Sequence, residues 1–215
     1  MRRFRLPLLP LALLALAGCA PTRTVVSEGS PGGTVTVHPA IQVRERTTTY
    51  PVVGATEEAI RRSLDHGAIG IDGRRYRGLT DWRIRWRFRY ERQGSRCSMA
   101  RVDVRLEITT TLPRWEPPPE VDPGLEEKWR RYRITLEEHE AGHRDRAVLA
   151  ANEILRSLRA IRDTDCRSIT ARANERGHEI VRRYHEENRR YDHETRHGRA
   201  QGAVWPPIDP PRDAP

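Results

Sequence analysis

The chain has 215 residues and a formal net charge of +9, and its positive charge is almost all arginine because Lys128 is the only lysine. This length allows one compact domain of ordinary size, and no internal repeat is visible, which excludes a repeat array. The arginines are interleaved with aspartate and glutamate, which argues against a nucleic-acid-binding protein, although a basic surface would favour lipid headgroups or acidic polymers.

Residues 1–19 are interpreted as a lipoprotein signal peptide. An arginine-rich start precedes an apolar run from Leu6 to Ala17, which is too short to span a bilayer comfortably. The run ends in Leu16-Ala17-Gly18-Cys19, which resembles a bacterial lipobox; a plain secretory signal followed by a free cysteine is the alternative. The lipobox implies acylation of Cys19 and a lipid-anchored, periplasm-facing protein, and Ala20 favours the outer membrane.

Residues 20–40 are rich in Ser, Thr, Pro and Gly, which indicates a flexible tether. The tether precedes a domain expected over residues 41–200, and residues 201–215 form a proline-rich tail. Export places the chain in an oxidising compartment, where Cys97 and Cys166 are an even pair. We therefore predict a disulfide between them, which closes a long loop and contributes roughly 4 kcal/mol.

Alternating apolar and charged residues predict a β-hairpin in the middle of the domain. Every second residue from Trp82 to Tyr90 is large and apolar with arginines between, and residues 101–108 alternate in the same way after a turn at Gln93-Gly94-Ser95. Antiparallel pairing would set Asp103 and Glu107 opposite the arginine row. We interpret that row as a solvated face, with an anion- or headgroup-binding patch as the alternative.

The remaining elements are a strand and three helices. A first strand is expected from Gln42 to Tyr50, and a short helix capped by Thr56 from there to Asp65. A continuous apolar stripe predicts a long helix from Asp122-Pro123 to about Arg162, and a second helix capped by Ser168 should run to about Arg190. The short connection makes these two helices antiparallel. The expected fold is therefore α+β, with a small antiparallel sheet packed against the long helix and the second antiparallel helix.

Residues 139–143 read His-Glu-Ala-Gly-His, the HExxH pattern of zinc hydrolases. Histidines at i and i+4 lie one above the other on a helix, so both can bind one zinc ion (Zn²⁺) while Glu140 acts as base on a bound water. A pair of satisfied core histidines in a chance pentad is the alternative. Gly142 argues against chance, because a mid-helix glycine costs about 1 kcal/mol relative to alanine and suggests that another segment passes close by.

A catalytic zinc site needs a third protein ligand and an open position for water. The returning helix draws level with the histidine pair only near residue 187, which places Glu175, His178 and Glu179 too early. The groups at the right level are His185, Asp192, His193 and His197. We predict His197 as the third ligand, with Asp192 as the competing ligand or as a carboxylate that orients an imidazole. A solvated, helix-terminating turn is the other interpretation of this cluster.

An oxyanion that develops during hydrolysis needs a hydrogen-bond donor near the metal. Candidate catalytic donors are Tyr191, His193 and Arg196, which the sequence does not rank.

Several short motifs together resemble one bacterial family. They are Thr49-Tyr50-Pro51-Val52-Val53-Gly54, Gly78-Leu79-Thr80-Asp81-Trp82, Cys97, Thr111-Leu112-Pro113, HEAGH, Cys166, and the run from Tyr191 to Gly198 with Gln201-Gly202. The family consists of HExxH-containing domains of unknown function (domain of unknown function 922) that are predicted to be secreted zinc-dependent proteases. The resemblance covers residues 41–205 and implies a metal at His139 and His143, a base at Glu140, and matching positions Asp192, Thr195, His197 and Gly198.

These features lead us to expect a zincin-like, zinc-dependent metallohydrolase. It would act on a peptide or protein substrate, with Cys19 tethering it to the membrane. A second hypothesis is a non-catalytic envelope lipoprotein in which a metal or the histidine pair staples the helices and the basic surface binds lipid or polysaccharide. A closed four-ligand site would be structural, whereas three ligands and a water would be catalytic. Hydrolysis of an amide in the cell-wall peptide shares the same chemistry.

Overall fold

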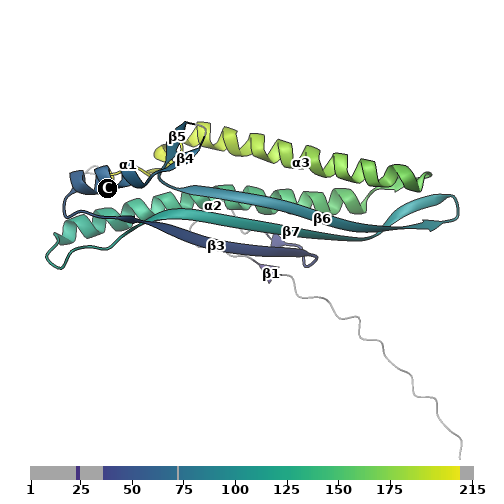
Figure 1. The fold of residues 1–215 in the computed structure, drawn as a ribbon, viewed down its shortest axis with the longest axis horizontal. Helices are drawn as coiled ribbons and strands as arrows, with labels where there is room; N and C mark the ends of the chain where they lie inside the picture. Colours follow the sequence, from purple (N-terminus) through teal and green to yellow (C-terminus); the bar gives the residue numbers. More distant parts are fainter. Residues whose placement is uncertain (1–22, 25–35, 72, 209–215) are drawn as a thin grey trace, which may run out of the picture.

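The computed structural model describes residues 23–24, 36–71 and 73–208. The predicted lipobox with Cys19, most of the tether and the end of the tail lie outside the described residues. The described chain forms an elongated, two-layer molecule in which two long antiparallel helices cover one face of a sheet (Figure 1). The α+β class is confirmed. Among the residues that the structure describes, no helix contains a sufficiently extended apolar segment for a transmembrane span.

The main sheet is built on the predicted hairpin of β6 (Leu79–Gln93) and β7 (Arg96–Trp115). The two strands are antiparallel, and Arg83 and Arg87 stand opposite Glu107 and Asp103, as expected. The short strand β8 (Arg162–Asp163) also pairs with β7.

Strand β3 (Ile41–Val52) is longer than predicted and runs parallel to β7, so the sheet order is β3-β7-β6 and the sheet is mixed rather than wholly antiparallel. The topology explains this direction. After β3, the chain passes through α1 (Glu57–Gly67) and a small hairpin of β4 (Ile69–Ile71) and β5 (Arg74–Tyr76) before β6 starts at the same end of the sheet. Strand β6 therefore runs opposite to β3. Because the hairpin turn reverses the chain once more, β7 runs parallel to β3, and it lies between β3 and β6. A separate pair joins β1 (Arg23–Thr24) and β2 (Thr36–Val37).

Each of the three α-helices begins at a residue whose side chain caps its N-terminus. Helix α1 has Thr56 as its N-cap, as predicted. Helix α2 (Pro123–Arg159) starts where the Asp122 side chain accepts a hydrogen bond from Gly124 N. Helix α3 (Cys166–Thr195) is capped by Asp165 rather than by Ser168, because Asp165 accepts from Arg167 N whereas the Ser168 hydroxyl donates to Asp163.

Helix α3 extends beyond the expected end. Tyr191 and Asp192 therefore lie on the helix and not in the turn that follows it. Arg196 and His197 then adopt left-handed backbone conformations, with φ of 53° and 54°, and turn the chain back into the short 3-10 helix η1 (Arg199–Gln201).

Two hydrophobic clusters hold the layers together. The larger one joins the apolar face of β6 and β7 to small residues of α2, including Ala147, Ala150 and Ala151, which allow the helix to approach the sheet closely. The smaller one gathers Trp115, Tyr132 and Trp205. Trp205 is buried and its Nε1 donates to Glu57 O, so the packed structure includes part of the segment after residue 200.

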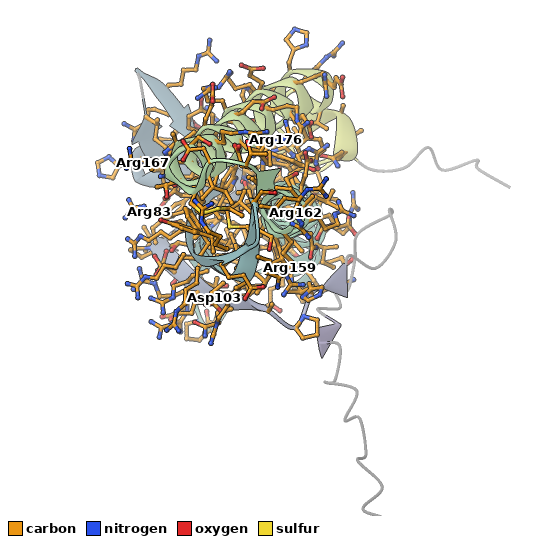
Figure 2. All side chains as sticks on the ribbon, turned by 90° about the vertical axis from the view of Figure 1, so that its right-hand side faces the viewer. Arg83, Asp103, Arg159, Arg162, Arg167 and Arg176 are labelled. Carbon is orange, nitrogen blue, oxygen red and sulfur yellow. A yellow bond between two sulfur atoms is a disulfide. The ribbon has the colours of Figure 1, made fainter. Side chains whose placement is uncertain are left out.

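Arginine side chains are spread over all layers of the molecule. Figure 2 views the end at which the β6–β7 turn lies, and its labelled arginines come from the sheet, α2 and α3 alike. The positive charge is therefore not confined to the exposed sheet face.

The predicted disulfide is present between Cys97, at the start of β7, and Cys166, the first residue of α3. The two Cα atoms lie 5.4 Å apart across a sequence separation of 69 residues. Cys97 is fully buried. The bond thus fixes the start of α3 to the sheet, far along the same helix that carries Asp192.

Replacing both Cys97 and Cys166 by serine should lower the free energy of unfolding by about 4 kcal/mol, because the unfolded chain regains the freedom of the closed loop. Urea unfolding followed by circular dichroism measures this change. Wild-type protein treated with a reductant is the control and should unfold like the double variant. Equal stability of oxidised and reduced wild type would contradict the expectation.

Candidate metal centre

The candidate site lies between α2 and the C-terminal half of α3. His139, Glu140 and His143 are 3%, 4% and 7% exposed, and they face the interior as the apolar stripe predicted. Opposite them, α3 presents Asn188 and Asp192, which lie four residues apart and therefore on one face of that helix. Asn188 contacts His143, so the level at which the returning helix was expected to meet the pair is confirmed.

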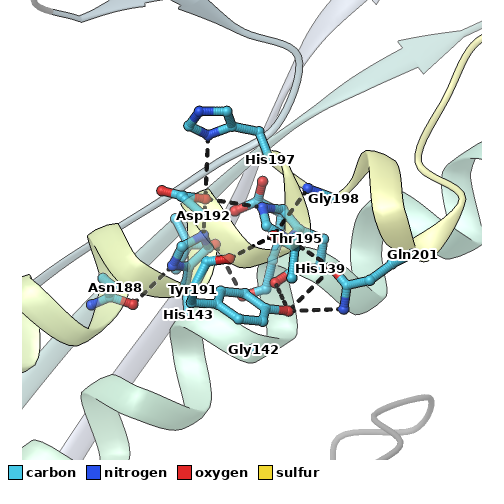
Figure 3. A network of polar contacts seen from close by, with 12 residues as sticks. His139, Gly142, His143, Asn188, Tyr191, Asp192, Thr195, His197, Gly198 and Gln201 are labelled. Atoms are coloured by element: carbon cyan, nitrogen blue, oxygen red, sulfur yellow. Dashed lines mark hydrogen bonds and ion pairs between the residues drawn. The ribbon is translucent and has the colours of Figure 1, made fainter.

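One carboxylate oxygen contacts both histidines (Figure 3). The Asp192 Oδ1 atom lies 3.0 Å from His143 Nε2 and 3.3 Å from His139 Nε2. These three side chains each offer one ligand atom, and the three atoms lie within 4.8 Å of one another. They form a cluster that could hold a metal ion.

The other nitrogen of each imidazole has an amide partner. His139 Nδ1 lies 2.9 Å from Gln201 Oε1, and His143 Nδ1 lies 2.8 Å from Asn188 Oδ1. With amide oxygens as acceptors, each Nδ1 carries the hydrogen, and each Nε2 directs its lone pair at the Asp192 carboxylate. Two lone pairs and a carboxylate repel one another, so the site needs a positive charge among them. Protons on the Nε2 atoms or a metal ion can supply this charge, and the donor set fits a metal ion.

The pKa shifts of Asp192 and His143 also favour a positive charge in the cluster. Burial raises the pKa of Asp192, but the hydrogen bonds of His139 and His143 and the charges of His143 and His197 together hold that pKa well below its usual range. Burial also lowers the pKa of His143, but the hydrogen bonds of Asp192 and Asn188 and the charges of Asp192 and Glu140 together shift it upward. The cluster therefore favours a positive charge beside Asp192. A metal ion supplies such a charge with neutral imidazoles.

Glu140 lies next to this cluster. Its Oε2 atom is buried and has no hydrogen-bond partner among the described residues, and burial raises its pKa. A Cβ atom on Gly78 would lie 2.6 Å from Glu140 Oε1, so a larger residue just before β6 would have to displace the carboxylate. The Glu140 side chain is thus enclosed, and its Oε2 atom keeps no partner among the described residues.

Gly142 makes room for Tyr191. A Cβ atom at Gly142 would lie 2.3 Å from the Tyr191 hydroxyl, which confirms that another segment passes close to α2 at this turn. The Tyr191 ring stacks on His139 with centroids 5.1 Å apart, and the Arg146 guanidinium lies 3.8 Å from the Tyr191 ring centroid. The Tyr191 hydroxyl donates to His139 O and accepts from Gln201 Nε2.

The predicted role of Tyr191 as a catalytic donor stays a prediction, and the structure places its ring beside His139. Its hydroxyl is engaged with His139 O and Gln201, and Tyr191 is not among the residues that line the cleft described below.

His197 does not join the cluster. Its Nδ1 atom lies 3.4 Å from Asp192 Oδ1, but the side chain is 45% exposed and the ring packs edge-on against Tyr76 of β5. The left-handed turn after α3 sets it on the outer side of Asp192 (Figure 3). Asp192, the alternative that the sequence left open, thus occupies the position that we had predicted for His197.

The remaining candidates, and His178, which the sequence analysis had excluded, lie outside the cluster of His139, His143 and Asp192. His193 is exposed on the last turn of α3, and Arg196 lies exposed at the rim. His185 stacks on Trp82 with ring centroids 4.2 Å apart, and His178 packs against Trp86.

Sequence reasoning assigned no role to Asn188 or Gln201, the two amide partners of the imidazoles. The available signals were the i, i+4 spacing of Asn188 and Asp192 and the polar Gln201 three residues after Gly198.

A cleft of about 730 Å³ opens onto the cluster. His139, Glu140, His143 and Asp192 line it together with Thr80, while the β4–β5 hairpin and the turn around His197 form its rims. The arrangement brings two imidazoles, the Asp192 carboxylate and the buried Glu140 carboxylate to the lining of one cleft.

Comparison with known proteins identifies the family of this chain. The family model described as bacterial protein of unknown function (DUF922) matches residues 47–198. The chain belongs to this family. No curated protein and no solved structure shows a significant match to it. Family membership confirms the resemblance seen in the motifs, while the family description assigns no activity.

In this DUF922 protein, Asp192→Ala should weaken zinc binding by more than the roughly 10- to 100-fold that removal of an outer hydrogen-bond partner causes. The change removes an oxygen that contacts both Nε2 atoms. His197→Ala should stay within that range, because its ring lies outside the ligand set. Zinc titration against a competing chelator measures both. A larger loss of zinc affinity in His197→Ala than in Asp192→Ala would show that His197, and not Asp192, is the third ligand.

Proposed function

We propose that this DUF922 protein is a zinc-dependent metallohydrolase, and specifically a peptidase. The observation that carries the proposal is the free, buried Oε2 atom of Glu140 beside two convergent Nε2 atoms in an open cleft. Buried polar groups are nearly always hydrogen-bonded, so an unsatisfied carboxylate oxygen at such a place suggests a functional partner.

His139, His143 and Asp192 would hold the zinc. Two neutral imidazoles and a carboxylate are a common donor set of catalytic zinc sites, with one position left for water. When bound, zinc supplies Lewis-acid polarisation of a carbonyl group and acidifies a water molecule. Gln201 and Asn188 fix the tautomer and orientation of the two rings through their Nδ1 atoms, which prepares both Nε2 lone pairs.

Glu140 would move the proton. Its carboxylate takes a proton from the attacking water and then passes it to the nitrogen of the leaving amine. Burial raises the pKa of Glu140, which brings it closer to the working pH and suits a group that must accept and return the same proton. Gly78 lies against the Oε1 side of the carboxylate, and Glu140 is one of the residues that line the cleft.

The number of ligands supports an enzyme over a structural site. A structural zinc is usually enclosed by four protein ligands. Among the described residues only His139, His143 and Asp192 form a ligand cluster, and the exposed His197 lies outside it. A position facing the cleft would thus stay open.

We further propose that the protein is anchored by a lipid on Cys19 and faces the periplasm, on the outer membrane where the cell has one. The lipobox-like end of the signal segment supports the anchor. The disulfide between Cys97 and Cys166 supports an oxidising compartment.

Glu140→Gln should retain zinc and lower kcat/KM for a fluorogenic casein or peptide about 10²- to 10⁴-fold, because the amide cannot accept the proton. Glu138→Gln, a change of the same kind two residues earlier on α2, is the control and should remain active. Zinc content is measured on the same samples. Equal activity of the Glu140 variant and wild type would remove Glu140 as the base.

Cys19→Ser should release the protein from the membrane fraction, because the residue that accepts the lipid is lost. Immunoblots of membrane and soluble fractions, together with metabolic labelling by a palmitate analogue, measure the change. Unchanged membrane association without label on either protein would argue against lipidation.

A further inference from the structure

Arginine dominates both rims of the cleft. The cleft-lining arginines are Arg74, Arg75 and Arg77 on the hairpin side and Arg189, Arg196 and Arg199 on the side of α3 and η1. Apart from the carboxylates of Glu140 and Asp192 at the centre, the described lining contains one acidic residue, Asp81. A bound zinc ion would add further positive charge. The cleft therefore carries a field that attracts anions.

Most of these arginines are not neutralised. Arg77 pairs with Asp65 at 2.6 Å, and Arg189 reaches Glu186 only at 4.0 Å. Arg75 donates to His66 O, a neutral carbonyl group. Arg74, Arg75, Arg196 and Arg199 have no carboxylate partner within the described ranges, which leave out residue 72. The exposed sheet face differs, because there Asp103 and Glu107 stand opposite Arg87 and Arg83.

A second observation locates one end of the cleft. Tyr132 lines it, and its hydroxyl is buried with no hydrogen-bond partner among the described residues. The ring is held by Trp129 and Trp205, with ring centroids 5.6 and 5.7 Å from that of Tyr132. Burial raises the pKa of Tyr132 to about 12, with the Arg77 charge acting in the opposite direction. The hydroxyl therefore stays protonated. The Arg77 guanidinium lies close enough to donate to its oxygen, while the hydroxyl hydrogen has no acceptor among the described residues.

A carboxylate is the ligand that such a pair of donors fits. It accepts hydrogen bonds only, and it binds guanidinium and hydroxyl donors together with charge assistance. Tyr132 precedes Glu140 by two turns of α2, about 12 Å along the axis at 1.5 Å per residue. An extended peptide covers that distance in about three or four residues.

We propose that the cleft selects peptides carrying a carboxylate side chain about three or four residues from the scissile bond, where Tyr132 and Arg77 bind it. The other rim arginines attract the acidic peptide as a whole. This inference rests on the proposed peptidase function, because only a peptidase has a scissile bond from which the position of the carboxylate is counted. Binding of the carboxylate itself depends only on the cleft. Acidic segments of proteins and cell-wall stem peptides both carry such groups.

The test is a positional scan. One fluorogenic peptide is made with glutamate placed singly at each position, and in matched form with glutamine, which has the same shape without the charge. We expect kcat/KM of the wild type to be about tenfold higher for glutamate at one position three or four residues from the cleaved bond. Cell-wall stem peptides form a second arm, and a preference for free over amidated carboxylates in either arm supports the proposal.

Tyr132→Phe is the decisive variant. Because the hydroxyl hydrogen has no acceptor among the described residues, removal of the hydroxyl should leave the melting temperature nearly unchanged or raised, and yet abolish most of the glutamate preference. Arg75→Gln on the rim should lower kcat/KM for acidic peptides and weaken its dependence on salt. Arg83→Gln/Arg87→Gln on the exposed sheet face is the charge-removal control and should retain both properties.

Measuring peptide binding apart from cleavage distinguishes failure of the carboxylate subsite from failure of the proposed peptidase function. Fluorescence anisotropy of the same peptides is measured with zinc-loaded Glu140→Gln. Tighter binding of the glutamate peptide without any cleavage by wild type would reject the peptidase and support the subsite. Equal kcat/KM and equal binding for glutamate and glutamine peptides, or an undiminished preference in Tyr132→Phe, would overturn the subsite.

Discussion

The contact of one Asp192 oxygen with the Nε2 atoms of His139 and His143 is the constraint around which the structure is arranged. It requires α3 to run back along α2 until Asp192 faces the histidines, and it requires both imidazoles to present lone pairs at once. Long antiparallel helices meet the first requirement. The amide oxygens of Asn188 and Gln201 meet the second by holding each Nδ1 hydrogen.

Several features far from the cluster act on the same contact. The disulfide ties the first residue of α3 to the sheet, so the helix cannot slide freely along α2. Near the other end, Gly142 allows Tyr191 to lie against α2, where it stacks on His139 and meets Gln201. The left-handed turn after α3 brings Gln201 back to His139 and leaves His197 on the outside. Each of these features lowers the conformational freedom of a side chain in the cluster or next to it.

The cleft joins this rigid centre to a rim of opposite character. The centre holds the buried Glu140 carboxylate and the half-buried Asp192 carboxylate, whereas the rims carry arginines from the β4–β5 hairpin, α3 and η1. The centre and the rims of the cleft are therefore suited to different tasks. The centre suits proton transfer and metal binding, where desolvation matters, and the rims suit attraction and alignment of an extended, acidic chain.

The sequence by itself determined the elements and the chemistry of the long helix. Periodicity was sufficient to place the β6–β7 hairpin, α2 and the inward-facing pentad, because those signals are local and repeat along the chain. The cysteine count was sufficient for the disulfide. Tertiary structure decided what depends on how separate segments meet. It set the parallel direction of β3, the choice of Asp192 over His197 and the roles of Asn188, Gln201 and Tyr191. Two positive φ angles after Thr195 turn His197 away from the ligand cluster, and no local pattern in the sequence marks such a turn in advance.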